Sequence, residues 1–319
     1  MKNFQTEFNT LAYIISKADR VLLFAHSDPD GDTVGSVLAF KEYLNSLGKT
    51  ADIACLSPFP SFLESLTEEK FEYPENLDIK SYDAAIGCDS VDRGFQTVVP
   101  DLSEKAVTVI FDHHPDIKLK ADVIMIDAKL SSTCELVYEY LVSQNAHISK
   151  NIATYLMIGI MSDTGNFQHS NTTSHVMEIS ADLLKKGASV MKIVKASFAN
   201  KKISTLKLWG RAFEKAKINP KNGLISTILT KKDLDECQAT TEDISQVATI
   251  LNTVPGTKFS LVLSEREDGK IKGSLRSEEY KGTDVSEIAH LFGGGGHKLA
   301  SGFEIRGKII ETKDGWLII

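Results

Sequence analysis

The chain has 319 residues, 42% of them hydrophobic, so it is long and apolar enough to form two domains with separate hydrophobic cores. Its formal net charge of −7 argues against a general nucleic-acid binder that covers phosphate backbones with lysine and arginine. A phosphate substrate remains compatible with this charge, because metal ions or a local basic patch can hold it.

The N-terminal segment, residues 1–20, is amphipathic and carries acidic, lysine and arginine side chains. It therefore lacks the apolar core of a signal peptide, and no apolar run in the chain reaches membrane-spanning length. The four cysteines are widely spaced and form no CxxC pair, which favours small buried side chains in a reducing compartment. We expect a cytoplasmic protein.

Short β-rich runs alternate with helical patterns through the first half of the chain. Strands are predicted at 21–25, 51–56, 82–87, 106–111 and 123–126. Helices are predicted at 33–47, 133–145, 150–162 and 174–187. This alternation is typical of an α/β domain with a doubly wound, mostly parallel sheet, which we assign to residues 1–187.

The pattern changes near Gly187, where a lysine-rich helical stretch begins. We predict that residues 188–215 are a helical connector, although their lysines also fit a basic surface for a substrate strand. Residues 216–319 form the second domain. Its predicted strands and helix lie at 224–229, 259–264, 271–276 and 284–291. The sequence thus predicts a smaller α+β domain after the α/β domain.

Acids and histidines follow three predicted strands of the first domain. His26 and the loop SDPDGD follow the first strand, Asp89 follows the third, and the segment DHHP at 112–115 follows the fourth. A further acid, Asp163, comes at the end of an apolar helix. Ligands bind beyond the carboxyl ends of the strands in open α/β sheets, so we expect these groups to converge on one crevice.

Five carboxylates packed into one partly desolvated crevice would repel one another strongly. These are the carboxylates of Asp30, Asp32, Asp89, Asp112 and Asp163. Two divalent cations remove this repulsion, because four ligating carboxylates balance their charge. Carboxylate and imidazole ligands without thiolate favour two Mn²⁺, with Mg²⁺ or Co²⁺ as alternatives. Each motif alone also fits a capped turn, and their joint placement at strand ends is what indicates a dinuclear centre.

Taken in order, these motifs resemble those of the DHH phosphoesterase family. The matching segments are HSDPDGDTVGS at 26–36, CDSVDR at 88–93, DHHP at 112–115 and SDTGNF at 162–167. Near the C-terminus, SLRS at 274–277 and FGGGGHKLASGF at 292–303 resemble the DHH-associated C-terminal domain. The resemblance spans nearly the whole chain, and it is strongest to the nanoRNase/pAp phosphatase group, whose members consist of these two domains.

The resemblance implies two metal ions that share one carboxylate. The first metal would be held by His26, Asp30 and Asp89. The second metal would be held by Asp32, Asp89, His113 and Asp163. The catalytic residues would be Asp89 as the bridge, Asp112 as the acid that orients the histidine pair, and His114, which would hydrogen-bond a phosphate oxygen of the substrate.

The resemblance also implies that the second domain binds the nucleotide end of the substrate. The glycines of the run, among them Gly294, Gly295 and Gly296, permit close backbone approach and outward-facing N–H groups suited to an anion, with His297 beside them. A flexible turn is the alternative explanation of the glycines. Arg276 fits a phosphate clamp or a surface salt bridge, and Arg93 is a weaker phosphate-binding candidate.

These features predict a phosphoesterase with its active site in the cleft between the domains. It would hydrolyse short single-stranded RNA to mononucleotides and remove the 3′-phosphate of pAp, as a homodimer that needs no membrane. The alternatives are a soluble phosphodiesterase for cyclic dinucleotides or pGpG and a catalytically silent nucleotide-binding sensor. A RecJ-type exonuclease and a manganese pyrophosphatase fit less well, because the first needs an added strand-binding domain and the second has a different C-terminal domain.

Overall fold

The computed structural model of the protein describes residues 2–60, 63–64, 66–89, 91–115, 117–196, 201–266, 268–312 and 315–319. The chain divides into two compact units, Met1–Asn200 and Lys201–Ile319. The stretch predicted as a connector is shared between them. Ile193 of helix α7 (Val190–Val194) packs in the core of the first unit, whereas Leu208 of helix α8 (Ile203–Glu214) packs in the core of the second.

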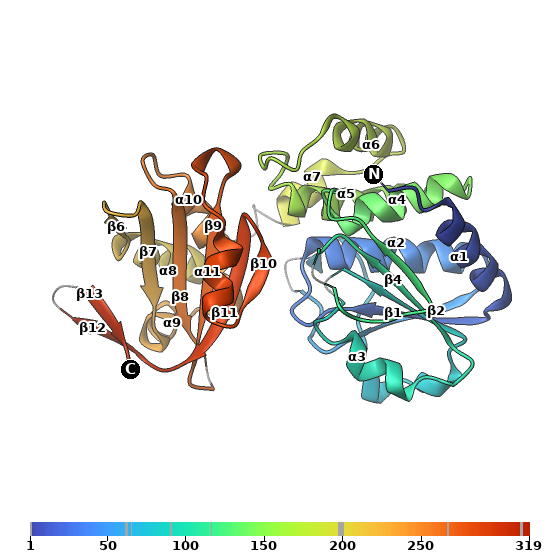
Figure 1. Ribbon diagram of the computed structural model, residues 1–319, viewed down its shortest axis with the longest axis horizontal. Helices are drawn as coiled ribbons and strands as arrows, with labels where there is room; N and C mark the ends of the chain where they lie inside the picture. Colours follow the sequence, from blue (N-terminus) through green and yellow to red (C-terminus); the bar gives the residue numbers. More distant parts are fainter. Residues whose placement is uncertain are drawn as a thin grey trace. The chain divides into compact units, whose positions relative to one another are not determined.

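A five-stranded sheet forms the centre of the first unit (Figure 1). Its strands are β1 (Arg20–Ala25), β2 (Thr50–Cys55), β3 (Ala84–Cys88), β4 (Val107–Asp112) and β5 (Val123–Ile126). The order is β2-β1-β3-β4-β5, and every neighbouring pair is parallel. The doubly wound prediction is confirmed. The strand order reverses between β1 and β3, and this switch point is where such sheets bind ligands.

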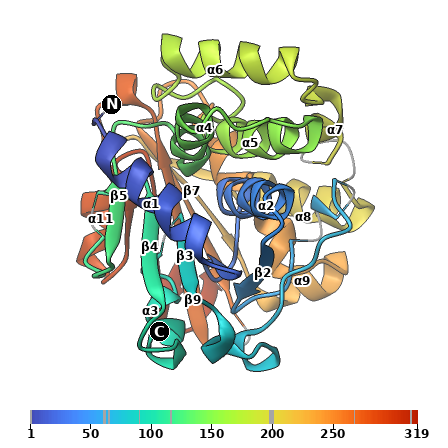
Figure 2. The ribbon, with the colours of Figure 1, turned by 90° about the vertical axis from the view of Figure 1, so that its right-hand side faces the viewer.

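Helices cover both faces of this sheet, as Figure 1 shows. One face carries α1 (Gln5–Lys17), α2 (Gly31–Ser46), α4 (Thr133–Ser143) and α5 (Lys150–Asp163), and the other carries α3 (Phe95–Val98). Helix α6 (Ser174–Lys185) lies outside α4 and α5 (Figure 2). Alternate residues of β1 supply the two cores: Leu23 belongs to the first cluster, and Leu22 and Phe24 belong to the second. Burial on both sides explains why the strands are continuously apolar.

The second unit is built on a six-stranded mixed sheet in the order β10-β11-β9-β8-β7-β6. Its strands are β6 (Lys217–Asn219), β7 (Leu224–Leu229), β8 (Phe259–Glu265), β9 (Lys270–Ser277), β10 (Gly295–His297) and β11 (Ala300–Arg306). Helices α8, α9 (Lys231–Cys237) and α10 (Val247–Asn252) pack on one face, and α11 (Val285–Leu291) packs on the other. A hairpin, β12 (Ile309–Thr312) and β13 (Gly315–Ile318), follows the sheet. The predicted α+β class is confirmed.

Two predictions about the chain as a whole can also be compared with the structure. All four cysteines are buried and none forms a disulfide, as expected for small core side chains. Among the helices of the described residues, none is long and apolar enough to cross a bilayer.

Candidate metal centre

The predicted ligands of the first unit converge at the carboxyl ends of β1, β3 and β4. His26 directly follows β1, Asp89 directly follows β3, and Asp112 ends β4. These three side chains are almost completely buried, with exposed fractions of 0%, 2% and 0%. Neighbouring parallel strands end at the same edge of the sheet, so residues far apart in the sequence meet there.

The loop SDPDGD both caps helix α2 and supplies two of these carboxylates. Asp30 is the N-cap, and its Oδ1 accepts hydrogen bonds from the backbone N–H groups of Asp32 at 3.0 Å and Thr33 at 3.2 Å. The Asp32 carboxylate is oriented away from this cap. It accepts hydrogen bonds from the N–H groups of Thr133 at 2.6 Å and Cys134 at 2.9 Å, at the start of α4. The capped-turn interpretation is therefore true of Asp30, and it leaves Asp32 available to the centre.

One group of possible metal ligands consists of His26, Asp30 and Asp89, whose nearest ligand atoms all lie within 4.8 Å of one another. The Nδ1 atom of His26 lies 2.6 Å from the carbonyl oxygen of Ser27, so Nδ1 carries the proton and the Nε2 lone pair is left for a ligand. His26 Nε2 and Asp89 Oδ1 are buried without a hydrogen-bond partner. Buried polar atoms rarely lack a partner, so a cation fits between these side chains.

A second group, Asp32, Asp89 and His113, meets the same distance criterion and shares Asp89 with the first. His113 Nε2 lies 3.1 Å from Asp163 Oδ2, 3.7 Å from Asp32 Oδ2 and 3.8 Å from Asp89 Oδ1. Its Nδ1 lies 3.4 Å from the carbonyl oxygen of Leu130. The three carboxylates assigned to the second metal therefore lie around Nε2 of His113, which is the fourth assigned ligand.

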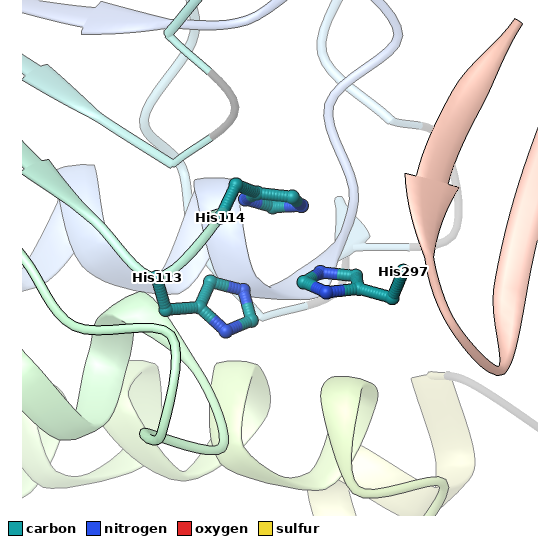
Figure 3. A group of neighbouring side chains, drawn as sticks. All are labelled: His113, His114 and His297. Atoms are coloured by element: carbon teal, nitrogen blue, oxygen red, sulfur yellow. The ribbon is translucent and has the colours of Figure 1, made fainter. Parts of the chain in front are cut away.

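Asp112 positions the backbone of His113 and His114 and the ring of His114. Its Oδ1 accepts hydrogen bonds from the N–H groups of His113 at 2.7 Å and His114 at 2.9 Å, and it lies 2.8 Å from His114 Nδ1. Figure 3 shows the two rings leaving the end of β4 next to each other, with centroids 4.6 Å apart. The ring of His113 is oriented by Leu130 instead, which the sequence did not indicate.

The electrostatics of these side chains also favour bound cations. Burial raises the pKa of Asp32 well above its usual range, and the charges of Asp163 and Asp89 raise it further. Burial also raises the pKa of Asp163, to about 6. For His113, burial opposes the charged form, but contact with Asp163 and the charges of Asp32 and Asp89 outweigh it and raise the pKa well above the usual value. Burial would raise the pKa of Asp89, but the neighbouring histidines outweigh it and lower the pKa of that carboxyl, so negative charge stays at the centre of the cluster, where a cation would be stabilised.

Metal binding should therefore release protons near neutral pH. Because the pKa values of His113 and Asp163 are raised, both groups hold protons at a higher pH than isolated side chains do, and a metal must displace those protons. We expect the apparent metal affinity to fall about tenfold per pH unit for each proton released as the pH is lowered. Calorimetric titration with Mn²⁺ at pH 7 in buffers of different ionisation enthalpy counts the protons. A count of zero would contradict this prediction.

In the second unit, the strand register brings Arg276 and His297 to one face of the sheet. Arg276 of β9 lies opposite Ala300 of β11, and Ala300 lies opposite His297 of β10. Directly opposed residues of antiparallel strands share a face, and Ala300 stands between the two side chains in this row. Figure 3 also labels His297, on strand β10. This arrangement suits the two predicted substrate-binding side chains.

The glycine run has a different structure from the one expected. Gly293 and Gly294 donate their N–H groups to the carbonyls of His290 and Ala289, at 3.1 and 2.9 Å, so they cap helix α11 and do not face outward as an anion nest. Gly295 and Gly296 belong to strand β10. A Cβ at Gly294 would collide with the carbonyl of Gly302. Close approach to β11 therefore explains Gly294, and its N–H group does not face outward as expected. Substrate binding by Gly294, Gly295 and Gly296 stays a prediction.

Other site features differ from, or add to, those named from the sequence. The side chain of Arg93 is exposed, and its backbone carbonyl accepts hydrogen bonds from Ser27 N and Oγ at 3.1 and 3.2 Å.

Thr33 Oγ1 donates to Asp89 Oδ2 at 2.5 Å, a contact that the sequence did not reveal. Asp89 itself has φ of +61°, and a non-glycine residue in this region is typical of a functional site.

Comparisons with known proteins find two matching family models and several related proteins. The model of the DHH family N-terminal domain matches residues 20–160, and that of the DHHA1 domain matches residues 221–314. The chain is 29% identical to the bifunctional oligoribonuclease and PAP phosphatase NrnA of Bacillus subtilis, over 91% of both chains. It is 28% identical to the protein of the same name from Thermus thermophilus, over 90% of this chain and 84% of that one.

Solved structures show the same fold. An exopolyphosphatase-related protein from Bacteroides fragilis is similar, with a TM-score of 0.88 and 25% identity, over 95% of this chain and 92% of the other. The exonuclease RecJ bound to manganese is more distant, with a TM-score of 0.51 and 12% identity, over 95% of this chain and 90% of that one. The latter likeness extends to the fold alone.

Proposed function

This chain belongs to the DHH family, and on that premise we propose that it is a two-metal phosphoesterase that hydrolyses short oligoribonucleotides to mononucleotides and removes the 3′-phosphate of pAp. The observation that carries the proposal is the pair of ligand groups that share Asp89. A shared carboxylate can bridge two metal ions, as two-metal hydrolysis of a phosphate ester requires.

Two Mn²⁺ ions fit these ligands best, with Mg²⁺ or Co²⁺ as alternatives. The first would be held by His26, Asp30 and Asp89, and the second by Asp32, Asp89, His113 and Asp163. The donor set contains carboxylate oxygens and imidazole nitrogens without thiolate, and Mn²⁺ accepts both types. When bound, the metals supply Lewis acidity and lower the pKa of water at the site.

The remaining polar groups position the substrate around this centre. Asp112 holds Nδ1 of His114 at 2.8 Å, which directs the other ring nitrogen, Nε2, away from the acid. That ring is only partly buried, with 23% of the side chain exposed, and in the proposed complex its Nε2 donates to a phosphate oxygen of the substrate. Such a donor stabilises the charge that builds up on the phosphate during hydrolysis. Thr33 holds the shared Asp89 through its hydroxyl group.

Replacing Arg276 by alanine is expected to weaken substrate binding more than it slows the chemical step. The guanidinium lies on the same sheet face as His297, where it can bind a substrate phosphate away from the reacting one. Loss of a charge-assisted hydrogen bond of about 1.5–3 kcal/mol should raise KM by roughly 10- to 100-fold with kcat little changed. Steady-state kinetics on pAp and a dinucleotide measure this. An unchanged KM for both substrates would remove Arg276 from the binding site.

The proposed function is tested by comparing substrates directly. The EDTA-treated protein is given Mn²⁺ and equal concentrations of pAp, RNA of 2, 5 and 24 nucleotides, matching DNA, cyclic di-AMP and pGpG. We expect fast release of mononucleotides from the 2-mer and of phosphate from pAp, with slow cleavage of the 24-mer. Preference for pGpG or a cyclic dinucleotide would favour a signalling phosphodiesterase. No hydrolysis of any substrate, despite bound Mn²⁺, would favour a nucleotide-binding sensor.

Three broader expectations stay predictions. They are an active site in a cleft between the two domains, assembly as a homodimer, and a location in the cytoplasm. Size-exclusion chromatography with light scattering gives the oligomeric state directly.

A further inference from the structure

Asn171 joins the C-terminal end of α5, which carries the predicted ligand Asp163, to the loop before α4, which together with the first turn of that helix contacts two other predicted ligands. Its Nδ2 donates to the carbonyl of Ser131 and to the carbonyl of Asp163, at 3.2 Å in each case. Ser131 lies in the loop before α4, and Asp163 is the last residue of α5. Both partners are acceptors, so the amide nitrogen and not the oxygen must face them. We infer that Asn171 is a positioning residue for the second metal alone, an inference that rests on the proposed function.

The loop before α4 and the first turn of that helix contact two of the second metal's other ligands. At the first turn of α4, which directly follows this loop, the N–H groups of Thr133 and Cys134 donate to the two oxygens of Asp32, at 2.6 and 2.9 Å. The loop's carbonyl at Leu130 lies 3.4 Å from His113 Nδ1 and so fixes which ring nitrogen faces the centre. A shift of this loop and of the turn that follows it would therefore displace both Asp32 and His113.

Glu135 stabilises the conformation of the loop before α4 through two hydrogen bonds to Ser131. This buried carboxylate accepts hydrogen bonds from the backbone N–H of Ser131 at 2.7 Å and from its hydroxyl at 2.8 Å. These two hydrogen bonds attach the Ser131 end of the loop to helix α4. The hydrogen bond from Asn171 to the Ser131 carbonyl therefore sets the position of this loop relative to Asn171.

The other end of the Asn171 bridge is the C-terminus of α5. The carbonyl of Asp163 belongs to the last turn, where helix carbonyls have no partner within the helix. It accepts hydrogen bonds from Asn171 Nδ2 and also from His169 Nδ1, at 3.2 Å each. Among the described residues, His169 makes no hydrogen bond to the loop before α4. Asn171 thus ties Asp163 to Asp32 and His113, whereas His169 acts only as a helix cap.

The first metal's ligands depend on different contacts. His26 is oriented by Ser27, Asp30 by the start of α2, and Asp89 by the hydroxyl of Thr33. In the described structure, Asn171 hydrogen-bonds to none of these residues. Loss of the Asn171 bridge should therefore weaken one metal and leave the other unchanged.

The test is an Mn²⁺ titration of wild type and Asn171→Ala, by calorimetry and by electron paramagnetic resonance. Wild type is expected to bind two ions with an exchange-coupled spectrum. In the variant, one ion should keep its affinity and the other should bind about 10- to 100-fold more weakly, as is usual when a residue that orients a metal ligand is lost. At intermediate Mn²⁺ the spectrum should be that of an isolated ion. Activity should return when Mn²⁺ is raised.

His169→Ala is the matched control, because it removes a donor to the same carbonyl and leaves the bridge intact. It should bind two ions like wild type, and both variants should keep the wild-type circular dichroism spectrum. Two unchanged affinities in Asn171→Ala, or equal weakening of both ions, would overturn the inference while leaving the proposed function standing. Failure of wild type to bind Mn²⁺ would overturn the proposed function itself. If Asn171→Ala does not fold, Asn171→Ser is titrated in the same way.

Discussion

Replacing Asp89 by alanine is expected to abolish turnover almost completely, because this carboxylate belongs to both groups of metal ligands. The side chain is 2% exposed and lies 3.5 Å from His26 Nε2 and 3.8 Å from His113 Nε2. Each metal contributes several kcal/mol of charge stabilisation, so the loss of the bridge should lower kcat by about three orders of magnitude or more. Initial rates on pAp and on a dinucleotide at saturating Mn²⁺ measure the effect.

The control for this variant is Asp101→Ala, since Asp101 is an exposed acid outside the centre. It should retain the rate and the metal content of wild type. Elemental analysis after gel filtration should show that Asp89→Ala has lost bound metal. Near-wild-type turnover by a correctly folded Asp89→Ala protein would rule out a dinuclear centre at this position.

Replacing Gly159 by alanine is expected to destabilise the first unit and disturb the centre together. A Cβ at this position of α5 would collide with Cys134 Sγ and would lie 2.5 Å from Asp32 Oδ1. Overpacking of this kind costs about 1–3 kcal/mol, and each kcal/mol lowers Tm by about 2–4 °C in a domain of this size. Displacement of Asp32 should also weaken binding of the second metal. Thermal unfolding with and without Mn²⁺ measures both effects.

Gly210→Ala is the matched control for this substitution. Gly210 lies within helix α8 and is exposed, and a Cβ added to it would have no neighbouring atom within 4 Å. Alanine there should stabilise the second unit by about 0.5–1 kcal/mol, because glycine lowers helix stability. If Gly159→Ala unfolds at the same temperature as wild type and binds Mn²⁺ equally well, the tight contact between α5 and Asp32 has no energetic importance.

The glycine run shows where local sequence reasoning fails. Four consecutive glycines suggested a loop with outward N–H groups, because glycine permits many backbone conformations. In the structure, Gly293 and Gly294 donate to carbonyls of α11, and Gly295 begins a strand. The choice between these outcomes depends on β11, which lies so close to Gly294 that a side chain would not fit. That neighbour cannot be recognised from the composition of the run.

The sequence by itself determined the fold class and the set of residues at the centre. Apolar strands alternating with helices specify a parallel sheet, and residues placed after its strands must meet at one edge, so His26, Asp89 and Asp112 could be grouped in advance. Their chemical types then indicated metal ions, because clustered carboxylates need positive charge. These inferences need only the chain order and the side-chain types.

Only the tertiary structure decided how the ligands are held. His113 is oriented by the backbone carbonyl of Leu130, and Asp32 by the backbone N–H groups of Thr133 and Cys134. Every residue has a carbonyl and nearly every residue has an N–H, so side-chain identity carries no signal for such contacts. The bridge through Asn171 likewise depends on where two segments meet in space. The sequence names the ligands, and the packing of α4 against α5 sets their positions.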